Sequence, residues 1–302
     1  MPPRPGPPPR RPTPRRRILL RRLAALALIV GLLGLGVWLA YAATRGSRSE
    51  TRSTPITSVV LPHQFRIVFP EGFTRRQMAQ RVQVVAAIAR RERDVRPRIS
   101  QRTYLAATRP RVFPGFGAKR RPFEGFLFPA TYNFTARTTS RQLVQAQLKA
   151  FRQDWSQLDL SYARSKNLTP YDVLIIASMV EKETLAPDER RLVAAVIYNR
   201  LHARMPLGID ATLRYGLDIP PTQSIRRSQL ESDNPYNTRK LAGLPPTPIA
   251  NPGLASMQAA AHPAKVQYLY FVRKPDKVHH YFTASFRDFT NYERAHGYAV
   301  SP

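Results

Sequence analysis

The stretch "YDVLIIASMVEKETLAPDER", residues 171–190, carries carboxylates at the end of an apolar segment. Residues 171–180 are apolar on nearly every face of a helix, which is typical of a helix that is buried all round. Glu181 and Glu183 follow directly. A buried carboxyl group is costly unless it is paired or becomes neutral, and in the second case its pKa rises. A carboxyl group with a raised pKa can serve as a general acid.

Two helices are predicted to meet at this stretch. The first begins with Thr169 as its N-cap, Pro170 at its first position and Asp172 at its third. The second begins at Asp188–Glu189, and its broad apolar face consists of Leu192, Val193, Val196, Ile197, Tyr198 and Leu201. Only "TLAP" joins the two helices, so we expect them to lie side by side or at an angle.

Glu181 and Glu183 point to different sides of the first helix, about 160° apart at 100° per residue. An ordinary glycosidase needs two carboxyl groups that flank the scissile bond, about 5 to 9.5 Å apart. These two cannot form that pair, so one could be catalytic while the other is structural. The alternative is that both are ion-pair partners of Lys182, Arg190 or Arg191.

The composition restricts the chemistry. The chain has 302 residues, 43% of them hydrophobic, which suits one or two globular domains. It has no cysteine, which excludes disulfides, thiolate catalysis and zinc sites built on cysteine. The six histidines form no HExxH or comparable metal spacing. We therefore expect neither a metal nor another cofactor.

The net charge of +29 suggests a nucleic-acid binder at first sight. However, the basic residues are scattered, and they form no zinc-finger, RNP or other nucleic-acid signature. The strong excess of arginine over lysine is also what a skewed genomic base composition produces. We expect no nucleic-acid partner; a positive surface also suits an acidic polymer such as cell wall.

The N-terminal part predicts the compartment. Residues 1–22 are rich in Arg and Pro without any acidic residue, which predicts a disordered basic tail on the cytoplasmic side. Residues 23–43 contain no charge and are long enough to cross the ~30 Å hydrocarbon core. A cleaved signal peptide is the alternative, because residues 40–42 read Ala-Tyr-Ala, but its apolar region is usually shorter. We favour an uncleaved single-pass anchor in the cell (inner) membrane, with residues 44–302 outside the cytoplasm.

The exported part alternates helices with short strands. Residues 44–64 predict a linker, 65–69 a strand and 70–72 a turn; helices are predicted from Thr74, over 104–110 and over 139–158. The aromatic segment 123–134 is either core packing or a wall of a sugar-binding cleft. Strands over 266–272 and 279–284 predict a β-hairpin, followed by a helix over 286–298. The fold class is therefore α+β: a transmembrane helix, then a mixed helical and antiparallel-sheet domain over 65–302.

Several blocks, in this order, resemble the endolytic murein transglycosylases, the MltG or YceG-like family. They include "PEGFTRRQMA" (70–79), "FEGFLFPATY" (123–132), "ASMVEKETLAPDERRLVAAVIYNRL" (177–201), "MPLGIDATLRYG" (205–216), "NPYNTRKLAGLPPTPIANPG" (234–253), "YLYFV" (268–272) and "HHYFT" (279–283). The resemblance covers roughly residues 65–290. It implies a membrane-anchored lyase that cuts nascent glycan strands of peptidoglycan.

The resemblance assigns the catalytic role to Glu183, the second glutamate of the "EKET" block. Protonated Glu183 would donate to the glycosidic oxygen between N-acetylmuramic acid and N-acetylglucosamine. The carboxylate would then take the proton of the muramic 6-hydroxyl as that oxygen attacks the anomeric carbon. The product is a 1,6-anhydro sugar, and no water is consumed.

The resemblance also implies substrate contacts from other positions: Thr184, Asp210, Thr212, Tyr215, Tyr236, Asn237, Thr238 and His280. Two neighbours depart from the family pattern, since Gly208 stands where Gln is common and Arg239 where Tyr is usual. Glu189 and Arg200 could instead be structural ion partners. A lone strand histidine such as His280 is also often a packing or surface residue.

The resemblance is incomplete upstream. Relatives usually have a LysM-like glycan-binding subdomain between the anchor and the "PEG" block, where this chain has only about 20 linker residues. We expect a shortened member that binds glycan with its catalytic domain alone. Peptidoglycan synthases or division proteins are the protein partners that the resemblance suggests, besides the plasma membrane. The competing hypothesis is a catalytically silent, membrane-anchored wall-binding or division scaffold.

Overall fold

The computed structural model describes residues 31, 33–42 and 64–298, and the chain divides into two units, Met1–Val60 and Leu61–Pro302. In the first unit, residues 33–42 are helical. None of the helices in the described ranges is long and apolar enough to cross a membrane. The tail 1–22, most of the predicted anchor 23–43 and nearly all of the linker 44–64 lie outside the described residues. Their bounds, and the expected lack of a LysM-like module there, stay predictions.

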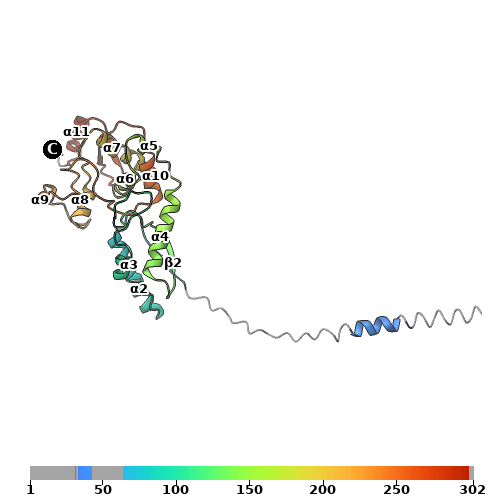
Figure 1. Cartoon of the computed structure of the whole chain (residues 1–302). Coiled ribbons are helices and arrows are strands. Elements are labelled where there is room, and N and C mark those ends of the chain that lie inside the picture. Colours follow the sequence, from blue (N-terminus) through green and yellow to red (C-terminus); the bar gives the residue numbers. More distant parts are fainter. Residues whose placement is uncertain (1–30, 32, 43–63, 299–302) are drawn as a thin grey trace, which may run out of the picture. The chain divides into compact units, whose positions relative to one another are not determined.

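The second unit begins with two helices between two paired strands. Strand β1 (Phe65–Val68) pairs antiparallel with β2 (Thr131–Phe134), with Phe65 opposite Phe134. Helices α2 (Arg75–Arg93) and α3 (Gln101–Ala107) lie between them in the chain. Thr74 closes a capping box with Gln77 at the start of α2. The predicted strand, turn and helix start are therefore confirmed, and Figure 1 shows this part at one end of the unit.

The central helices follow. They are α4 (Ser140–Trp155), α5 (Ser161–Ser165), α6 (Pro170–Glu183) and, after the 3₁₀ turn Pro187–Glu189, α7 (Arg190–His202). Helix α6 starts as predicted: Pro170 is its first residue, and Thr169 and Asp172 form a capping box. Every residue from Val173 to Val180 is buried, which confirms a helix enclosed on all sides. Helix α6 therefore holds its C-terminal residues on a rigid support.

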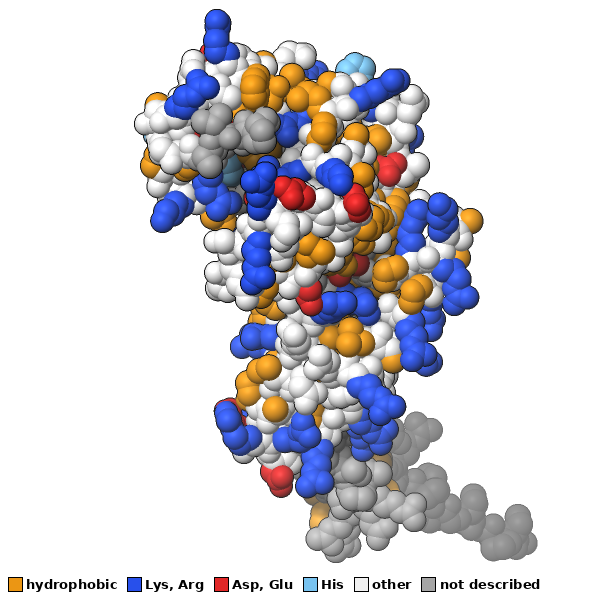
Figure 2. Space-filling view, turned by 90° about the vertical axis from the view of Figure 1, so that its left-hand side faces the viewer, with side chains coloured by type: hydrophobic (Ala, Val, Ile, Leu, Met, Phe, Trp, Pro, Cys, Tyr) orange, Lys and Arg blue, Asp and Glu red, His pale blue; other side chains and the backbone are white. Residues whose placement is uncertain are grey.

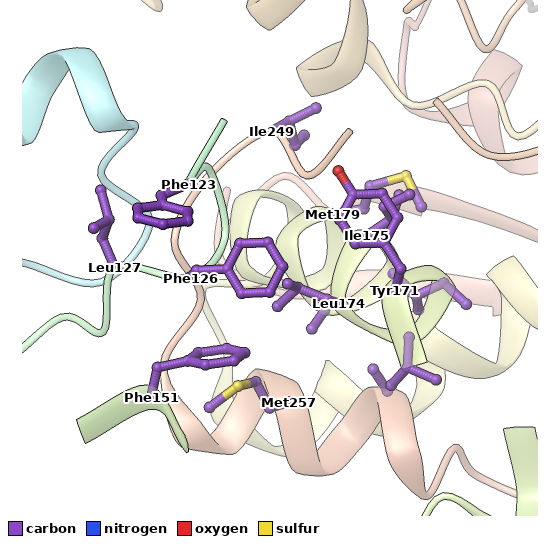
Figure 3. Close-up of a cluster of buried hydrophobic side chains, with 14 of the residues drawn as sticks. Phe123, Phe126, Leu127, Phe151, Tyr171, Leu174, Ile175, Met179, Ile249 and Met257 are labelled. Carbon is purple, nitrogen blue, oxygen red and sulfur yellow. The ribbon is translucent and has the colours of Figure 1, made fainter. Parts of the chain in front are cut away.

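The core is built around α6, and aromatic rings fill one side of it (Figure 3). The Phe126 ring lies 5.2 Å from the Phe151 ring and 6.2 Å from the Tyr171 ring, centroid to centroid. Phe123 and Phe134 are also buried in this core. The rings of Phe126 and Phe134 thus pack the interior, and the alternative of a sugar-stacking wall is wrong for these two rings.

The C-terminal part supplies short helices and the predicted hairpin. Helices α8 (Asp210–Gly216), α9 (Arg227–Leu230) and α10 (Leu254–Ala261) precede strands β3 (Tyr270–Arg273) and β4 (His280–Thr283), and α11 (Phe286–Ala295) ends this part. The strands pair antiparallel, with Arg273 opposite His280. Both are shorter than predicted, but the hairpin and the α+β class are confirmed.

Candidate functional site

A cavity of about 1900 Å³ opens where α6, α8, the β3–β4 hairpin and α11 meet the start of α2. Single small-molecule sites usually measure about 300–1,000 Å³, so this volume suits a segment of a polymer. Five of the predicted site residues line it: Glu183, Asp210, Tyr215, Tyr236 and His280. These residues come from distant parts of the sequence, and the fold brings them to one cavity.

Glu183 is the last residue of α6 and is half-buried at the cavity. Burial and the nearby charge of Asp210 raise the pKa of Glu183 to about 7. Arg273, a backbone hydrogen bond from Ala211 and Lys182 act in the opposite direction. The C-terminal end of a helix carries partial negative charge, which also disfavours the carboxylate. A substantial fraction of Glu183 side chains therefore keeps the proton at neutral pH, which is the form that a general acid needs.

Glu181 has a different role, at the start of helix α10. Its Oε2 accepts hydrogen bonds from the Gly253 backbone N–H (3.1 Å) and the Ser256 hydroxyl (2.7 Å), at the start of α10. A carboxylate at a helix N-terminus compensates the unpaired N–H groups there. Neither Glu181 nor Glu183 forms an ion pair within 4.0 Å in the described part of the chain, so the ion-pair alternative is wrong for both. The expected separation of the two carboxylates is confirmed.

The two departures from the family pattern have local structural roles. Arg239 forms an ion pair with Asp210, with Nε 2.6 Å from Oδ1. Gly208 has a φ of +67°, and a Cβ there would lie 3.0 Å from Nη1 of Arg200. That guanidinium donates to the Leu207 carbonyl oxygen at 2.7 Å, so glycine leaves room for the contact. Arg239 thus neutralises part of the charge that Asp210 brings to Glu183.

Four of the predicted contact residues are buried. Thr212 and Thr238 are buried and share a hydrogen bond of 2.9 Å, and the buried Asn237 amide donates to the carbonyl oxygens of Leu230 and Ser232. Thr184 is also buried, and its hydroxyl has no hydrogen-bond partner among the described residues. None of the four lines the cavity. Substrate contact by them stays a prediction, and their placement favours a supporting role.

Glu124 is a site residue that the sequence reasoning missed. It lines the same cavity, yet its side chain is buried. Its Oε1 accepts from the Arg75 backbone N–H (2.8 Å) and the Asn251 amide (3.0 Å), and its Oε2 accepts from the Tyr215 hydroxyl (3.0 Å). Burial raises the pKa of Glu124 to about 7. Glu124 therefore fixes the hydroxyl of Tyr215, a predicted substrate contact.

His280 and Glu189 form a second buried arrangement at this cavity. The His280 Nδ1 lies 2.7 Å from Glu189 Oε2, and the His280 backbone N–H donates to Oε1 at 2.8 Å. Arg200, the expected partner of Glu189, instead donates to the carbonyl oxygen of Leu269 at 2.6 Å. The prediction of a Glu189–Arg200 ion pair is therefore wrong.

Comparisons with known proteins identify the family. The sequence model of the YceG-like family matches residues 41–295. The chain belongs to the YceG-like family. It is 32% identical over 246 residues to an endolytic murein transglycosylase of Bacillus subtilis, covering 78% of this chain and 66% of that protein. It is 31% identical over 227 residues to one of Streptococcus pneumoniae, covering 68% of this chain but 40% of that protein.

The YceG-like fold is also seen in a crystal structure. A YceG-like protein of Listeria monocytogenes superposes with a TM-score of 0.59 at 28% identity, over 75% of each chain. Among the described residues of this YceG-like chain, no group of three or more His, Cys, Asp or Glu side chains could hold a metal ion.

The YceG-like domain should become less stable as pH rises through the range in which Glu124 titrates. Its carboxyl has a pKa of about 7 in the folded state, against an ordinary value of 4.5, so between these values the folded state binds more protons than the unfolded state. The free energy of unfolding then falls as pH rises through this window, and Glu183 adds to the slope in the same direction. Urea unfolding between about pH 5 and pH 8 measures the slope.

Glu124→Gln is expected to flatten this pH dependence. The glutamine oxygen can accept from the Arg75 N–H, and its amide nitrogen can donate to the Tyr215 hydroxyl, so the contacts survive without a titrating group. An unchanged slope in Glu124→Gln would contradict the expected protonation of the folded carboxyl.

Proposed function

We propose that this chain is a lytic transglycosylase that cleaves the bond between N-acetylmuramic acid and N-acetylglucosamine in nascent peptidoglycan strands. One observation carries the proposal: Glu183, with a pKa raised to about 7, lines a cavity large enough for a glycan segment. The names of the curated relatives supply the reaction class. The activity would terminate glycan strands by leaving a 1,6-anhydro-muramic end.

One carboxyl group is enough for this chemistry. Glu183 donates its proton to the glycosidic oxygen as the bond to the anomeric carbon breaks. The 6-hydroxyl oxygen then bonds to that carbon, and its proton returns to the Glu183 carboxylate. Atoms balance without water, and Glu183 ends the cycle in the protonated state from which it started.

Activity should fall as pH rises through the range in which Glu183 loses its proton. The pKa of Glu183 is raised to about 7, so the acid is protonated below that pH and ionised above it. Because the first step needs the protonated form, kcat/KM is expected to fall about tenfold per pH unit on the alkaline side. The measurement is the initial rate of glycan cleavage as a function of pH. A rate that keeps rising well above neutral pH would contradict the role of Glu183 as acid.

A second cavity has a basic lining, which suits a polymer that carries acidic groups. Its volume is about 910 Å³, its lining includes five arginines and no carboxylate, and Phe113 and Phe123 form part of its apolar floor. The arginines are Arg98, Arg109, Arg111, Arg141 and Arg152. Phe123 lines this cavity and the adjacent Glu124 lines the larger one. Figure 2 shows basic side chains over the whole visible face. Peptides attached to the glycan would present carboxylates to such surfaces.

The direct test is the mass of the products. The full chain in detergent is incubated with uncrosslinked glycan, and the masses of the fragments are measured by mass spectrometry. Anhydro ends make each new fragment lighter than a hydrolysis product by one water, ~18 Da. A silent scaffold, the alternative function, would bind glycan without releasing any fragment, and reducing ends would indicate a hydrolase.

We also propose an organisation for the whole chain: residues 1–22 cytoplasmic, 23–43 a single membrane anchor, 44–64 a linker and 65–302 the catalytic domain outside the cytoplasm. The uncharged run behind an arginine cluster supports this arrangement. It would place the enzyme beside peptidoglycan synthases or division proteins.

A reporter that is active only outside the cytoplasm, fused after Pro302, is expected to be active in cells. Protease added to intact cells should leave Arg10 uncut, because the basic tail is on the inner side. Cleavage at Arg10 from outside would reverse the proposed orientation.

A further inference from the structure

The Glu189–His280 pair holds an imidazole in one orientation at the edge of the large cavity. Glu189 ends the 3₁₀ turn before α7, and His280 is the first residue of β4. Their side chains are 7% and 2% exposed. Because one carboxylate accepts from both the backbone N–H and Nδ1 of His280, the ring can neither rotate nor flip without losing a contact. Nδ1 and the backbone N–H are thus both committed to Glu189.

The ring has one nitrogen left. Phe271 and Phe282 enclose His280, with ring centroids 5.3 and 6.0 Å away. Nε2 has no hydrogen-bond partner in the described part of the chain, and it is not among the buried polar atoms that lack one. His280 lines the cavity that also contains Glu183. Since Nδ1 faces Glu189, the Nε2 edge is the polar edge that can face this cavity.

His280, Arg273 and Glu183 all line the same cavity. Arg273 lies opposite His280 in the antiparallel pairing of β3 and β4, so the two side chains project from the same face of the hairpin. This face of the hairpin, with Arg273 and His280, therefore borders the cavity that contains the acid Glu183.

We propose that His280 Nε2 accepts a hydrogen bond from the muramic 6-hydroxyl, and that Glu189 is the positioning residue that holds the imidazole for this contact. The inference rests on the proposed lytic reaction and adds a second group to it. In the first step Glu183 is protonated and committed to the glycosidic oxygen. A neutral imidazole supplies the separate acceptor that aims the attacking hydroxyl at the anomeric carbon. Once Glu183 has given up its proton and the glycosidic bond has broken, the 6-hydroxyl turns its single O–H from Nε2 to the Glu183 carboxylate and transfers the proton there, so the reaction still balances and His280 stays neutral.

A dependence on pH follows, because only the neutral imidazole can accept at Nε2. Glu183 alone predicts a plateau at low pH and a loss of activity above neutral pH. The pair predicts a bell-shaped profile, with a second loss on the acidic side. Other charged groups at this end of the cavity are Arg273 on β3, Arg200 on α7 and Glu293 on α11. Any acidic loss that they cause would persist when His280 is replaced.

The test is kcat/KM against pH for the full chain in detergent, acting on uncrosslinked glycan. For the wild type we expect a bell-shaped dependence of kcat/KM on pH. For His280→Gln we expect a loss on the order of 10²-fold at the optimum and no remaining acidic limb. Glu189→Gln should lose a similar factor, and the double variant no more than the larger single loss, because the two residues act as a unit. A wild-type profile without an acidic limb would overturn the proposal even if the variants fail to fold.

His279→Gln is the matched control. His279 is the neighbouring histidine and also contacts a carboxylate, with Nδ1 3.0 Å from Asp276 Oδ2, but this pair is about half exposed and does not line the cavity. Its kcat/KM and pH profile should equal those of the wild type. If the wild type forms no anhydro product, the proposed function fails; if it forms the product while His280→Gln keeps the acidic limb, only the role of His280 fails.

Discussion

Glu183→Gln is expected to lower the rate of anhydro-product formation by at least about 10²- to 10⁴-fold, the usual contribution of a general acid–base group. Glutamine keeps the shape and the hydrogen-bonding capacity of the side chain, but it can neither give nor take the proton. Thermal unfolding should show an intact fold, because the substitution replaces a half-buried carboxyl, whose pKa is raised to about 7, by a neutral amide of the same shape. The measurement is the rate of fragment release with product masses.

Glu181→Gln is the control, two residues earlier on the same helix. Its carboxylate accepts from the Gly253 N–H and the Ser256 hydroxyl at the start of α10, away from the cavity. We expect near wild-type turnover and a loss of about 0.5–2 kcal/mol in the free energy of unfolding, as for other helix caps. Wild-type turnover in Glu183→Gln together with a loss in Glu181→Gln would mean that the two roles are exchanged.

Phe126→Ala is expected to lower the free energy of unfolding by about 3–5 kcal/mol. The side chain is 1% exposed, and its ring packs against the rings of Phe151 and Tyr171, beside Leu174 of α6 (Figure 3). Removing the ring leaves a cavity that rigid neighbours cannot fill. In a domain of this size the loss corresponds to a fall in Tm of roughly 6–20 °C. Urea and thermal unfolding measure both quantities.

Phe286→Ala is the matched substitution at the surface. Phe286 is 48% exposed and begins α11, where its ring lies 5.5 Å from the Tyr270 ring. Phe286→Ala should lower the free energy of unfolding by less than half as much as Phe126→Ala, because a half-exposed ring buries less apolar area in the folded state. Equal losses would contradict the central position of Phe126 in the core.

Local signals in the sequence were sufficient for parts of the fold. Thr169, Pro170 and Asp172 predicted the start of α6, because capping depends on residues within one turn. Two runs of strand-forming residues separated by a short segment predicted the β3–β4 hairpin, and the spacing of Glu181 and Glu183 predicted two separate places for their carboxylates. The catalytic assignment of Glu183 came from the resemblance and not from such signals.

Contacts between distant segments were not accessible in this way. The three groups that donate to Glu124 belong to residues 49, 91 and 127 positions away, and Glu189 and His280 are 91 positions apart. Nothing near "FEGF" distinguishes a core aromatic segment from a cleft wall, because ring packing depends on which helices arrive later. The one local signal for the site was Glu124 itself, a carboxylate inside an otherwise apolar segment.

Cleavage in water enriched in ¹⁸O shows whether bond breaking by Glu183 consumes water. The wild-type chain should release fragments whose new muramic ends contain no ¹⁸O, because the 6-hydroxyl oxygen of the sugar itself closes the ring. A hydrolase would instead place one solvent oxygen at each new end, about 2 Da heavier in ¹⁸O water. Fragments without the label would support the lytic mechanism, and labelled reducing ends would contradict it.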